Sequence, residues 1–292
     1  MPMAQGYFCA KYKAMKKIIA ALDGLDFSVS AAKYAAYLAS SAKAMLSGIF
    51  LDDRTYHSYR IYDLLDDEGL SESRLKEMNA KEDQVRKEAV KEFEKICNQA
   101  DAKFKVRHDR NTALKELLTE SIYADILVID RRNTFGNKDR KIPGAFLKSV
   151  LNNMACPALV VPSSFRIFHK LIFLYDGSPP SVYAIKAFAY VLTPFCKLPL
   201  EILTVKQSGS NPDISGKYLM NDWIKKYFTQ IIYKETQGDP EDAVIQYAKT
   251  QKVAPLFIAG ARPQGVLSPW FRESMADTLI KKLQAPLFVA RY

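Results

Sequence analysis

A duplicated pattern of short apolar runs constrains the fold of this chain more than any other feature of its sequence. Residues 17–24 and 170–177 are both apolar runs that begin with Lys and end in Asp-Gly. In each copy, small and apolar residues at helical spacing follow, beginning near Val29 and near Val182. Self-similarity of this kind indicates that the chain builds the same structural unit twice.

The far ends of the two copies also correspond. Residues 124–130 match 254–260, and residues 156–161 match 285–290. The apolar and helical patterns between these ends predict five apolar strands that alternate with four helices in each copy. Buried strands that alternate with helices form parallel sheets with helices on both faces. We therefore expect an α/β protein of two domains, each with a five-stranded parallel Rossmann-like sheet.

The domain boundaries follow from this repeat. We expect a leader at 1–14, a first domain at 15–163 and a second at 169–292. Ser28 and Ser181 are predicted N-caps of the first helix in each copy, because a Ser hydroxyl accepts from the free backbone N–H groups there. Ser268 and Pro269 are the predicted start of the last helix. The remaining strands are expected at 45–51, 103–108, 126–130, 158–161, 200–205, 230–235, 256–260 and 287–290; the helices at 29–41, 73–98, 113–121, 144–154, 180–192, 217–228, 241–251 and 269–283.

Length and composition agree with two folded domains. The chain has 292 residues, of which 48% are hydrophobic and 25% charged, as in ordinary globular proteins. No apolar run approaches the roughly 20 residues that a membrane-spanning helix needs. Residues 1–14 lack the apolar core of a secretory signal. We therefore expect a cytoplasmic protein without a membrane partner.

The charge pattern and the cysteines exclude two further classes of site. The net charge of +10 is spread over both halves, so we expect no specific nucleic-acid partner. No two cysteines form a CxxC pair, and none has a short zinc-site spacing to a histidine, so no metal site is expected. The residues concerned are Cys9, Cys97, Cys156, Cys196, His57, His108 and His169.

The turn after the first strand of each copy carries a family resemblance. Residues 23–28 read Asp-Gly-Leu-Asp-Phe-Ser and residues 176–181 read Asp-Gly-Ser-Pro-Pro-Ser, and each copy ends in Pro followed by apolar residues. In this order, twice over, the motifs resemble the universal stress protein family across nearly the whole chain. The resemblance implies adenine nucleotide alpha hydrolase-like domains whose fifth strands pair between the repeats. The chain would then be an intrachain pseudo-dimer, with a homodimer of two chains as a further expectation.

The resemblance also implies candidate binding residues. In the family, the Asp of this turn faces the base or ribose of a nucleotide; alternatively, it caps the turn. Members that bind ATP carry Gly-x2-Gly-x9-Gly-(Ser/Thr) after strand four, where glycine lets backbone N–H groups approach phosphate. Domain two keeps only the first glycine and the final Ser, with Pro263 and Glu273 replacing the other glycines. Domain one begins the motif at an aspartate and keeps the last glycine. The candidate residues are Asp23, Gly24, Asp130, Gly144, Asp176, Gly177, Gly260 and Ser274.

A basic loop replaces the missing glycines in domain one. Two interpretations stay open: the loop is a solvated surface, or its cations hold an anionic ligand such as ATP, AMP or another phosphorylated metabolite. The second interpretation ranks domain one above domain two as a pocket. The basic residues are Arg131, Arg132, Lys138, Arg140 and Lys141.

The sequence favours a non-enzymatic function. It shows no nucleophile with a base and an orienting group, so no catalytic residue is assigned, although weak nucleotide hydrolysis stays open. Our leading hypothesis is a regulatory or interaction module of the stress response, with an unknown protein partner and degenerate nucleotide motifs. The alternative is a nucleotide-binding protein that retains a ligand site in domain one. A less favoured alternative is an ATP-pyrophosphatase-type enzyme, because residues 22–28 superficially resemble a Ser-Gly-Gly-x-Asp-Ser loop.

Overall fold

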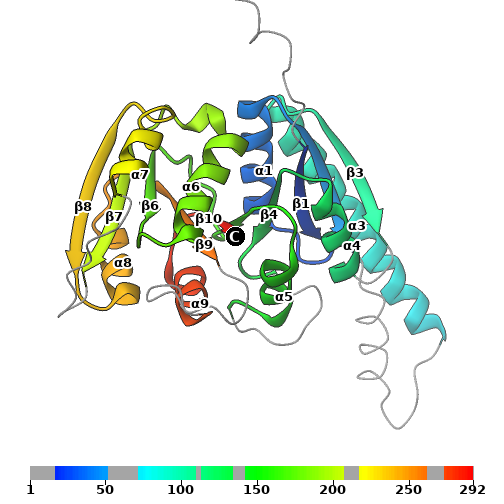
Figure 1. Ribbon diagram of the computed structural model, residues 1–292. Coiled ribbons are helices and arrows are strands. Elements are labelled where there is room, and N and C mark those ends of the chain that lie inside the picture. The colour runs from blue at the N-terminus through cyan, green and yellow to red at the C-terminus, as the bar shows by residue number, and fades with distance from the viewer. Residues whose placement is uncertain are drawn as a thin grey trace, which may run out of the picture.

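The protein forms one continuous ten-stranded sheet between two layers of helices (Figure 1). The computed structural model describes residues 17–51, 72–109, 113–133, 142–206, 217–261 and 273–291. The strand order is β3-β2-β1-β4-β5-β10-β9-β6-β7-β8, so each half has the same order. Within each half, neighbouring strands pair in parallel. The halves meet at β5 and β10, which pair antiparallel.

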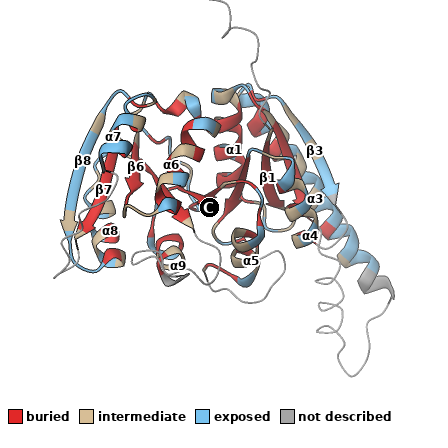
Figure 2. Ribbon diagram, viewed as in Figure 1, coloured by how far each residue is buried: buried red, intermediate tan, exposed pale blue. Residues whose placement is uncertain are grey.

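The strands are apolar runs because helices cover both faces of the sheet. Every residue of β4 and β5 is buried, whereas the outer strand β8 is mostly exposed. Figure 2 shows the buried interior along the central strands. The strands of the first half are β1 Lys17–Asp23, β2 Met45–Leu51, β3 Phe104–Asp109, β4 Ile126–Asp130 and β5 Ala158–Val161; those of the second half are β6 Lys170–Leu174, β7 Leu200–Lys206, β8 Ile231–Gln237, β9 Pro255–Ala261 and β10 Leu287–Arg291.

The helices divide between the two faces of the sheet. Side chains of α1, α3, α6 and α7 pack in one core cluster, and those of α4, α5, α8 and α9 pack in the other. Their bounds are α1 Val29–Ala42, α3 Glu72–Gln99, α4 Ala113–Ile122, α5 Ala145–Asn153, α6 Pro179–Val191, η1 Thr193–Phe195, α7 Lys217–Ile224, α8 Pro240–Lys249 and α9 Glu273–Lys282. None of the helices in the described ranges has the length and apolar composition needed to cross a bilayer.

The predicted fold class is confirmed, with one local error. Ser28 caps α1 as predicted, since its side chain accepts from the Ala31 N–H at 3.1 Å. The prediction that Ser181 caps α6 is wrong. The two prolines of the Ser-Pro-Pro-Ser turn start this helix earlier, with Ser178 as N-cap, so Ser181 lies inside the first turn and donates to the Ser178 carbonyl at 2.8 Å. Ser268 and Pro269, like the leader 1–14, lie outside the described residues.

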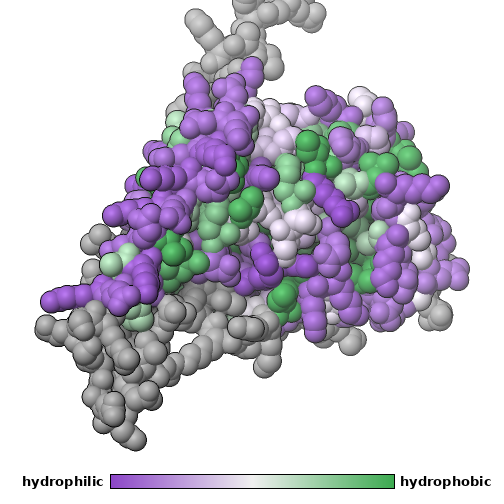
Figure 3. All heavy atoms as spheres, turned by 180° about the vertical axis from the view of Figure 1, so that it is seen from behind, coloured by the Kyte–Doolittle hydropathy of each residue, from purple (hydrophilic) through white to green (hydrophobic). Residues whose placement is uncertain are grey.

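The long helix α3 packs on the sheet through its C-terminal half. Phe93 fills the space above Gly48, where an added Cβ would lie 2.6 Å from the Phe93 ring. Phe93 also contacts the rings of Phe50 and Phe104 edge-on. The outward side of α3 carries exposed Glu and Lys, and Figure 3 shows a mostly hydrophilic surface on this side of the molecule.

The two halves are joined by a short antiparallel strand pair. Leu287, Phe288 and Val289 of β10 face residues of β5, with Phe288 opposite Leu159. The Phe288 ring packs edge-on against Phe188 of α6, at 5.3 Å between centroids. This pairing covers two apolar strand edges that would otherwise be exposed.

Side chains on both faces of the sheet reinforce this junction. Tyr34 of α1 donates to the carbonyl of Arg166, in the segment between the halves, at 3.0 Å. Tyr37 packs against Phe195 of the second half, at 5.5 Å between ring centroids. On the other face, Lys148 of α5 forms an ion pair with Asp277 of α9. The halves are therefore held by contacts beyond the sheet itself.

Candidate ligand site at the strand ends

In domain one, the turn after β1 is organised by Asp23. Its Oδ1 atom accepts hydrogen bonds from the backbone N–H groups of Leu25 at 2.8 Å and Asp26 at 3.1 Å. Burial raises the pKa of Asp23 above its ordinary value. Asp23 therefore caps its turn, and its contact with a nucleotide stays a prediction.

The equivalent turn in domain two has the same design. Asp176 Oδ1 accepts from the backbone N–H of Ser178 at 2.9 Å and from its hydroxyl at 2.5 Å. Gly177 has a φ of 78°, a left-handed conformation that favours glycine. Both aspartates thus cap their own turns.

Asp130 is the most buried acid at these strand ends, with 2% of its surface exposed. Its Oδ2 accepts from the Ser28 hydroxyl at 2.5 Å, and its Oδ1 accepts from the backbone N–H of Arg132 at 2.8 Å. The Arg132 guanidinium also donates to both oxygens, each at 3.3 Å. The hydrogen bond with Asp130 raises the pKa of Arg132. The carboxylate is therefore bonded to the N-cap of α1.

Gly260 lies at the equivalent place in domain two. Asp130 pairs with Val161 of β5, and Gly260 pairs with Ala290 of β10. A Cβ added to Gly260 would lie 2.2 Å from the Pro180 carbonyl oxygen, so the strand packs directly against the start of α6. The space beside this strand end thus holds the Asp130 carboxylate in domain one and the backbone of α6 in domain two.

The helices that follow the two candidate phosphate loops are α5 in domain one and α9 in domain two. Gly144 is the buried N-cap of α5 and, as a glycine, has no side chain that could cap this helix end. Ser274 is the second residue of α9 as described, after Glu273. Residues 134–141 and 262–272 lie outside the described ranges. Gly144 and Ser274 therefore stay predictions as ligand residues.

The basic loop of domain one is partly used by the protein itself. Arg131 donates to the carbonyl oxygens of Leu283 at 2.7 Å and Lys281 at 3.4 Å, and to the Gln284 side chain at 3.3 Å. These carbonyls end α9, where a cation is favourable. Burial lowers the pKa of Arg131. The loop cations that fall outside the described residues are Lys138, Arg140 and Lys141.

Helix α3 brings further charges to the domain-one turn, which the sequence did not predict. Arg86 approaches Gly24 so closely that an added Cβ would lie 3.0 Å from its Cγ. The guanidinium pairs with Glu82 at 3.5 Å and Asp83 at 3.6 Å. In sequence these residues resemble the solvated face of a charged helix, and no local signal distinguishes them. Within the described ranges, no group of three or more His, Cys, Asp or Glu could hold a metal ion.

The fold defines a Rossmann-like α/β protein with the same strand order in both halves. No family model matches the sequence. The chain is 23% identical to the universal stress protein Slr1230 of Synechocystis sp. over 299 aligned positions, covering 95% of this chain and 100% of that protein. The chain is thus similar over nearly its whole length to a universal stress protein, and its fold has two copies of the same strand order.

Solved structures show the same fold over nearly the full length. A universal stress protein from Archaeoglobus fulgidus is 18% identical, with a TM-score of 0.63 and coverage of 94% of this chain and 98% of that one. A putative universal stress protein from Pseudomonas aeruginosa is 14% identical, with a TM-score of 0.56 and coverage of 96% and 94%. These likenesses extend across both halves, so the arrangement of the two repeats is shared.

Proposed function

We propose that this protein is a non-enzymatic regulatory or interaction module of the stress response, acting in the cytoplasm with degenerate nucleotide motifs. The observation that supports the proposal is the buried Asp130. A carboxylate stands where ATP-binding relatives are expected to have the first glycine of the phosphate motif, and its oxygens are already bonded to Ser28 and Arg132. The function then depends on protein contacts rather than on nucleotide chemistry.

Charge explains why this arrangement disfavours a triphosphate. The N-terminus of a helix attracts anions, but at α1 the Ser28 cap is bonded to the anionic Asp130. A second anion in the same partly buried place would be repelled. Arg131, the first cation of the loop, is bonded to α9 instead. We infer that in domain one the Asp130 carboxylate takes the place of a bound phosphate.

The strand pairing suggests how the repeats replace a dimer. In our proposal the antiparallel β5–β10 pair makes one chain equivalent to two single-repeat subunits. Further association of two chains would then use other surfaces, as would an unidentified protein partner.

Calorimetry with nucleotides tests the proposal. We expect no heat when ATP, ADP, AMP or cyclic AMP is titrated at millimolar concentration into the wild-type protein. Asp130→Gly removes the carboxylate, and Asp130→Asn keeps its shape without its charge. If the charge of Asp130 prevents nucleotide binding, both variants should bind ATP more tightly than the wild type. Circular dichroism checks that both variants are folded. Tight ATP binding by the wild type, or phosphate or pyrophosphate release, would contradict the proposal.

A second candidate function rests on Gly144. The N-cap of α5 is a glycine, so no side chain covers this helix end, where backbone N–H groups can bind an anion. We propose, as the alternative, that domain one binds a phosphorylated metabolite there. Gly144→Glu should abolish such binding through bulk and charge, whereas Ser149→Glu, farther along the same helix, should not. Equal affinity in both variants would place the ligand elsewhere.

A further inference from the structure

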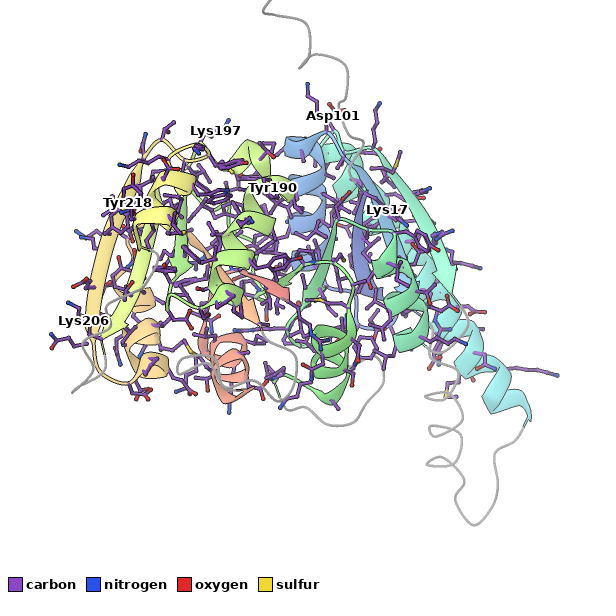
Figure 4. All side chains as sticks on the ribbon, in the orientation of Figure 1. Lys17, Asp101, Tyr190, Lys197, Lys206 and Tyr218 are labelled. Atoms are coloured by element: carbon purple, nitrogen blue, oxygen red, sulfur yellow. The ribbon has the colours of Figure 1, made fainter. Side chains whose placement is uncertain are left out.

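An exposed aromatic surface lies where α6 and α7 pack together in domain two. Tyr190 of α6 is 52% exposed, and Tyr218 of α7 is 81% exposed. Figure 4 shows these two side chains on neighbouring helices, with Lys197 beyond the end of α6. We call this the α6–α7 aromatic surface; its rings are Tyr183, Tyr190, Tyr218, Trp223 and Tyr227.

Three of these rings form an ordered group. Trp223 and Tyr227 stack with centroids 4.6 Å apart and an interplanar angle of 29°. Tyr190 meets both of them edge-on, at 6.4 Å from Trp223 and 5.6 Å from Tyr227. The Tyr227 hydroxyl donates to the Tyr190 hydroxyl at 3.5 Å. The contacts among the three rings fix their positions. Part of the ring surface stays accessible, because Tyr190 is half exposed.

Lysines accompany these rings on the same elements. Lys186 lies one helical turn before Tyr190, and its charge is close enough to help lower the pKa of Tyr190, after the larger contribution of the Tyr227 hydrogen bond. Lys225 lies between Trp223 and Tyr227 in the chain and is exposed. Among the described charged residues of α7 and its following turn, Asp222 is the acid, and it pairs with Lys226 at 3.2 Å. The local charge is therefore positive.

We propose that the α6–α7 aromatic surface binds single-stranded nucleic acid without sequence preference. Bases would stack on the exposed rings, and the lysines would contact phosphates. The positive charge, locally and over the chain at +10, complements such a polyanion. The exposed Lys225 and Lys226 lie beside the rings, whereas lysine is depleted at protein–protein interfaces. Planar faces with cations therefore favour a base over a peptide.

The surface could not be predicted because its parts are distant in sequence. Tyr183 and Tyr190 belong to α6, and Trp223 and Tyr227 follow the start of α7 after an intervening strand and its connections. Residues 217–228 combine aromatic residues with lysines in the sequence, but only the fold places Tyr190 against Trp223 and Tyr227.

Fluorescence anisotropy with a labelled oligonucleotide tests the proposal. The probe is a 15-nucleotide oligo(U) carrying fluorescein, titrated with the full chain at low salt. Tyr190→Ala and Tyr218→Ala should each weaken binding by about tenfold, since each removes a stacking face. Tyr123→Ala is the matched control, because Tyr123 is 73% exposed in domain one, and its affinity should equal that of the wild type.

The charge contribution is measured separately. Lys225→Glu should weaken oligo(U) binding and make the salt dependence shallower by about 0.7 in log–log slope for each phosphate that the protein no longer neutralises. Lys105→Glu, an exposed change on β3 with the same charge difference, should leave the slope unchanged. If both variants weaken binding equally, the attraction is general and the proposed surface is wrong.

Other outcomes would also overturn the proposal. These are no binding of oligo(U) at low salt, wild-type affinity in both Tyr variants, or equal affinity for a duplex of the same length. A further such outcome has two parts: poly-L-glutamate displaces oligo(U), and Tyr190→Ala weakens the binding of poly-L-glutamate itself. That result would assign the surface to an acidic protein segment instead.

Discussion

Asp130 and Gly260 occupy equivalent positions at the ends of β4 and β9, and the residue at this position determines how the strand packs against the neighbouring helix. In domain one the Asp130 carboxylate reaches the Ser28 hydroxyl, so the space between strand and helix is filled by polar contacts. In domain two the absence of a Cβ lets β9 approach the Pro180 carbonyl directly. A side chain at position 260 would overlap the start of α6.

The close approach at Gly260 leads to a stability prediction. Gly260→Ala should lower the free energy of unfolding by roughly 1–3 kcal/mol, because the new Cβ would overlap backbone atoms of Pro180 that cannot rotate away. Gly24→Ala is the control, because its Cβ would meet only the flexible Arg86 side chain at 3.0 Å, and it should cost less. Urea unfolding of the two variants measures the difference; an equal or larger loss in Gly24→Ala would refute the packing argument.

Asp23 leads to a prediction about pH. Burial raises its pKa in the folded protein above the ordinary value of 3.8, so the folded state holds this proton more tightly than the unfolded chain. The stabilising contribution is complete below the unfolded pKa and is lost as pH rises toward the folded pKa. Asp23→Asn keeps an oxygen that can accept from Leu25 and does not ionise. Its stability relative to the wild type should therefore increase as the pH rises above the ordinary value of 3.8.

Urea unfolding of both proteins across this range checks the Asp23 prediction. Asp26→Asn serves as the control, because this neighbouring acid is exposed and its replacement changes the same charge. If the difference between Asp23→Asn and the wild type does not change with pH, burial of the charged form is not the cause.

The strands and helices could be predicted from local pattern, whereas the contacts between them could not. Apolar runs ending in Asp-Gly locate β1 and β6 because both faces of a parallel sheet must be apolar. The α6 N-cap was misplaced because Pro179 starts the helix before the Ser that matches Ser28. The Asp130–Ser28 bond and the Arg131–Leu283 bond join residues far apart in the chain, and only the folded topology brings them together.

Arg131 connects the segment after β4 to the end of α9, and the connection is testable. Arg131→Ala should lower the free energy of unfolding by about 1–2 kcal/mol, because the last carbonyls of α9 lose charged donors. Arg166→Ala removes an exposed guanidinium near the junction and should change stability by less than about 0.5 kcal/mol. Chemical unfolding monitored by circular dichroism compares the variants. Equal effects would show that the α9 contact contributes nothing specific.

The continuous sheet should make the two repeats unfold together, and the chain provides a way to observe this. Both tryptophans, Trp223 and Trp270, belong to the second repeat, whereas circular dichroism reports on both. The junction is short, with three residue pairs between β5 and β10, so its stability depends strongly on Phe288 and its contact with Phe188. The wild-type protein should therefore show the same urea midpoint by tryptophan fluorescence and by circular dichroism.

Weakening the junction should separate these two signals. Phe288→Ala removes a fully buried ring, at a cost of about 3–5 kcal/mol, and should move the fluorescence midpoint below the dichroism midpoint. Phe228→Ala is the matched control, because this ring is equally buried in the second repeat but does not belong to the junction strands. It should lower both midpoints together, since the coupled strands still transmit the loss to the first repeat. Separate midpoints in the wild type would mean that the sheet does not couple the repeats. Coincident midpoints in Phe288→Ala would mean that the coupling does not depend on the Phe288 ring.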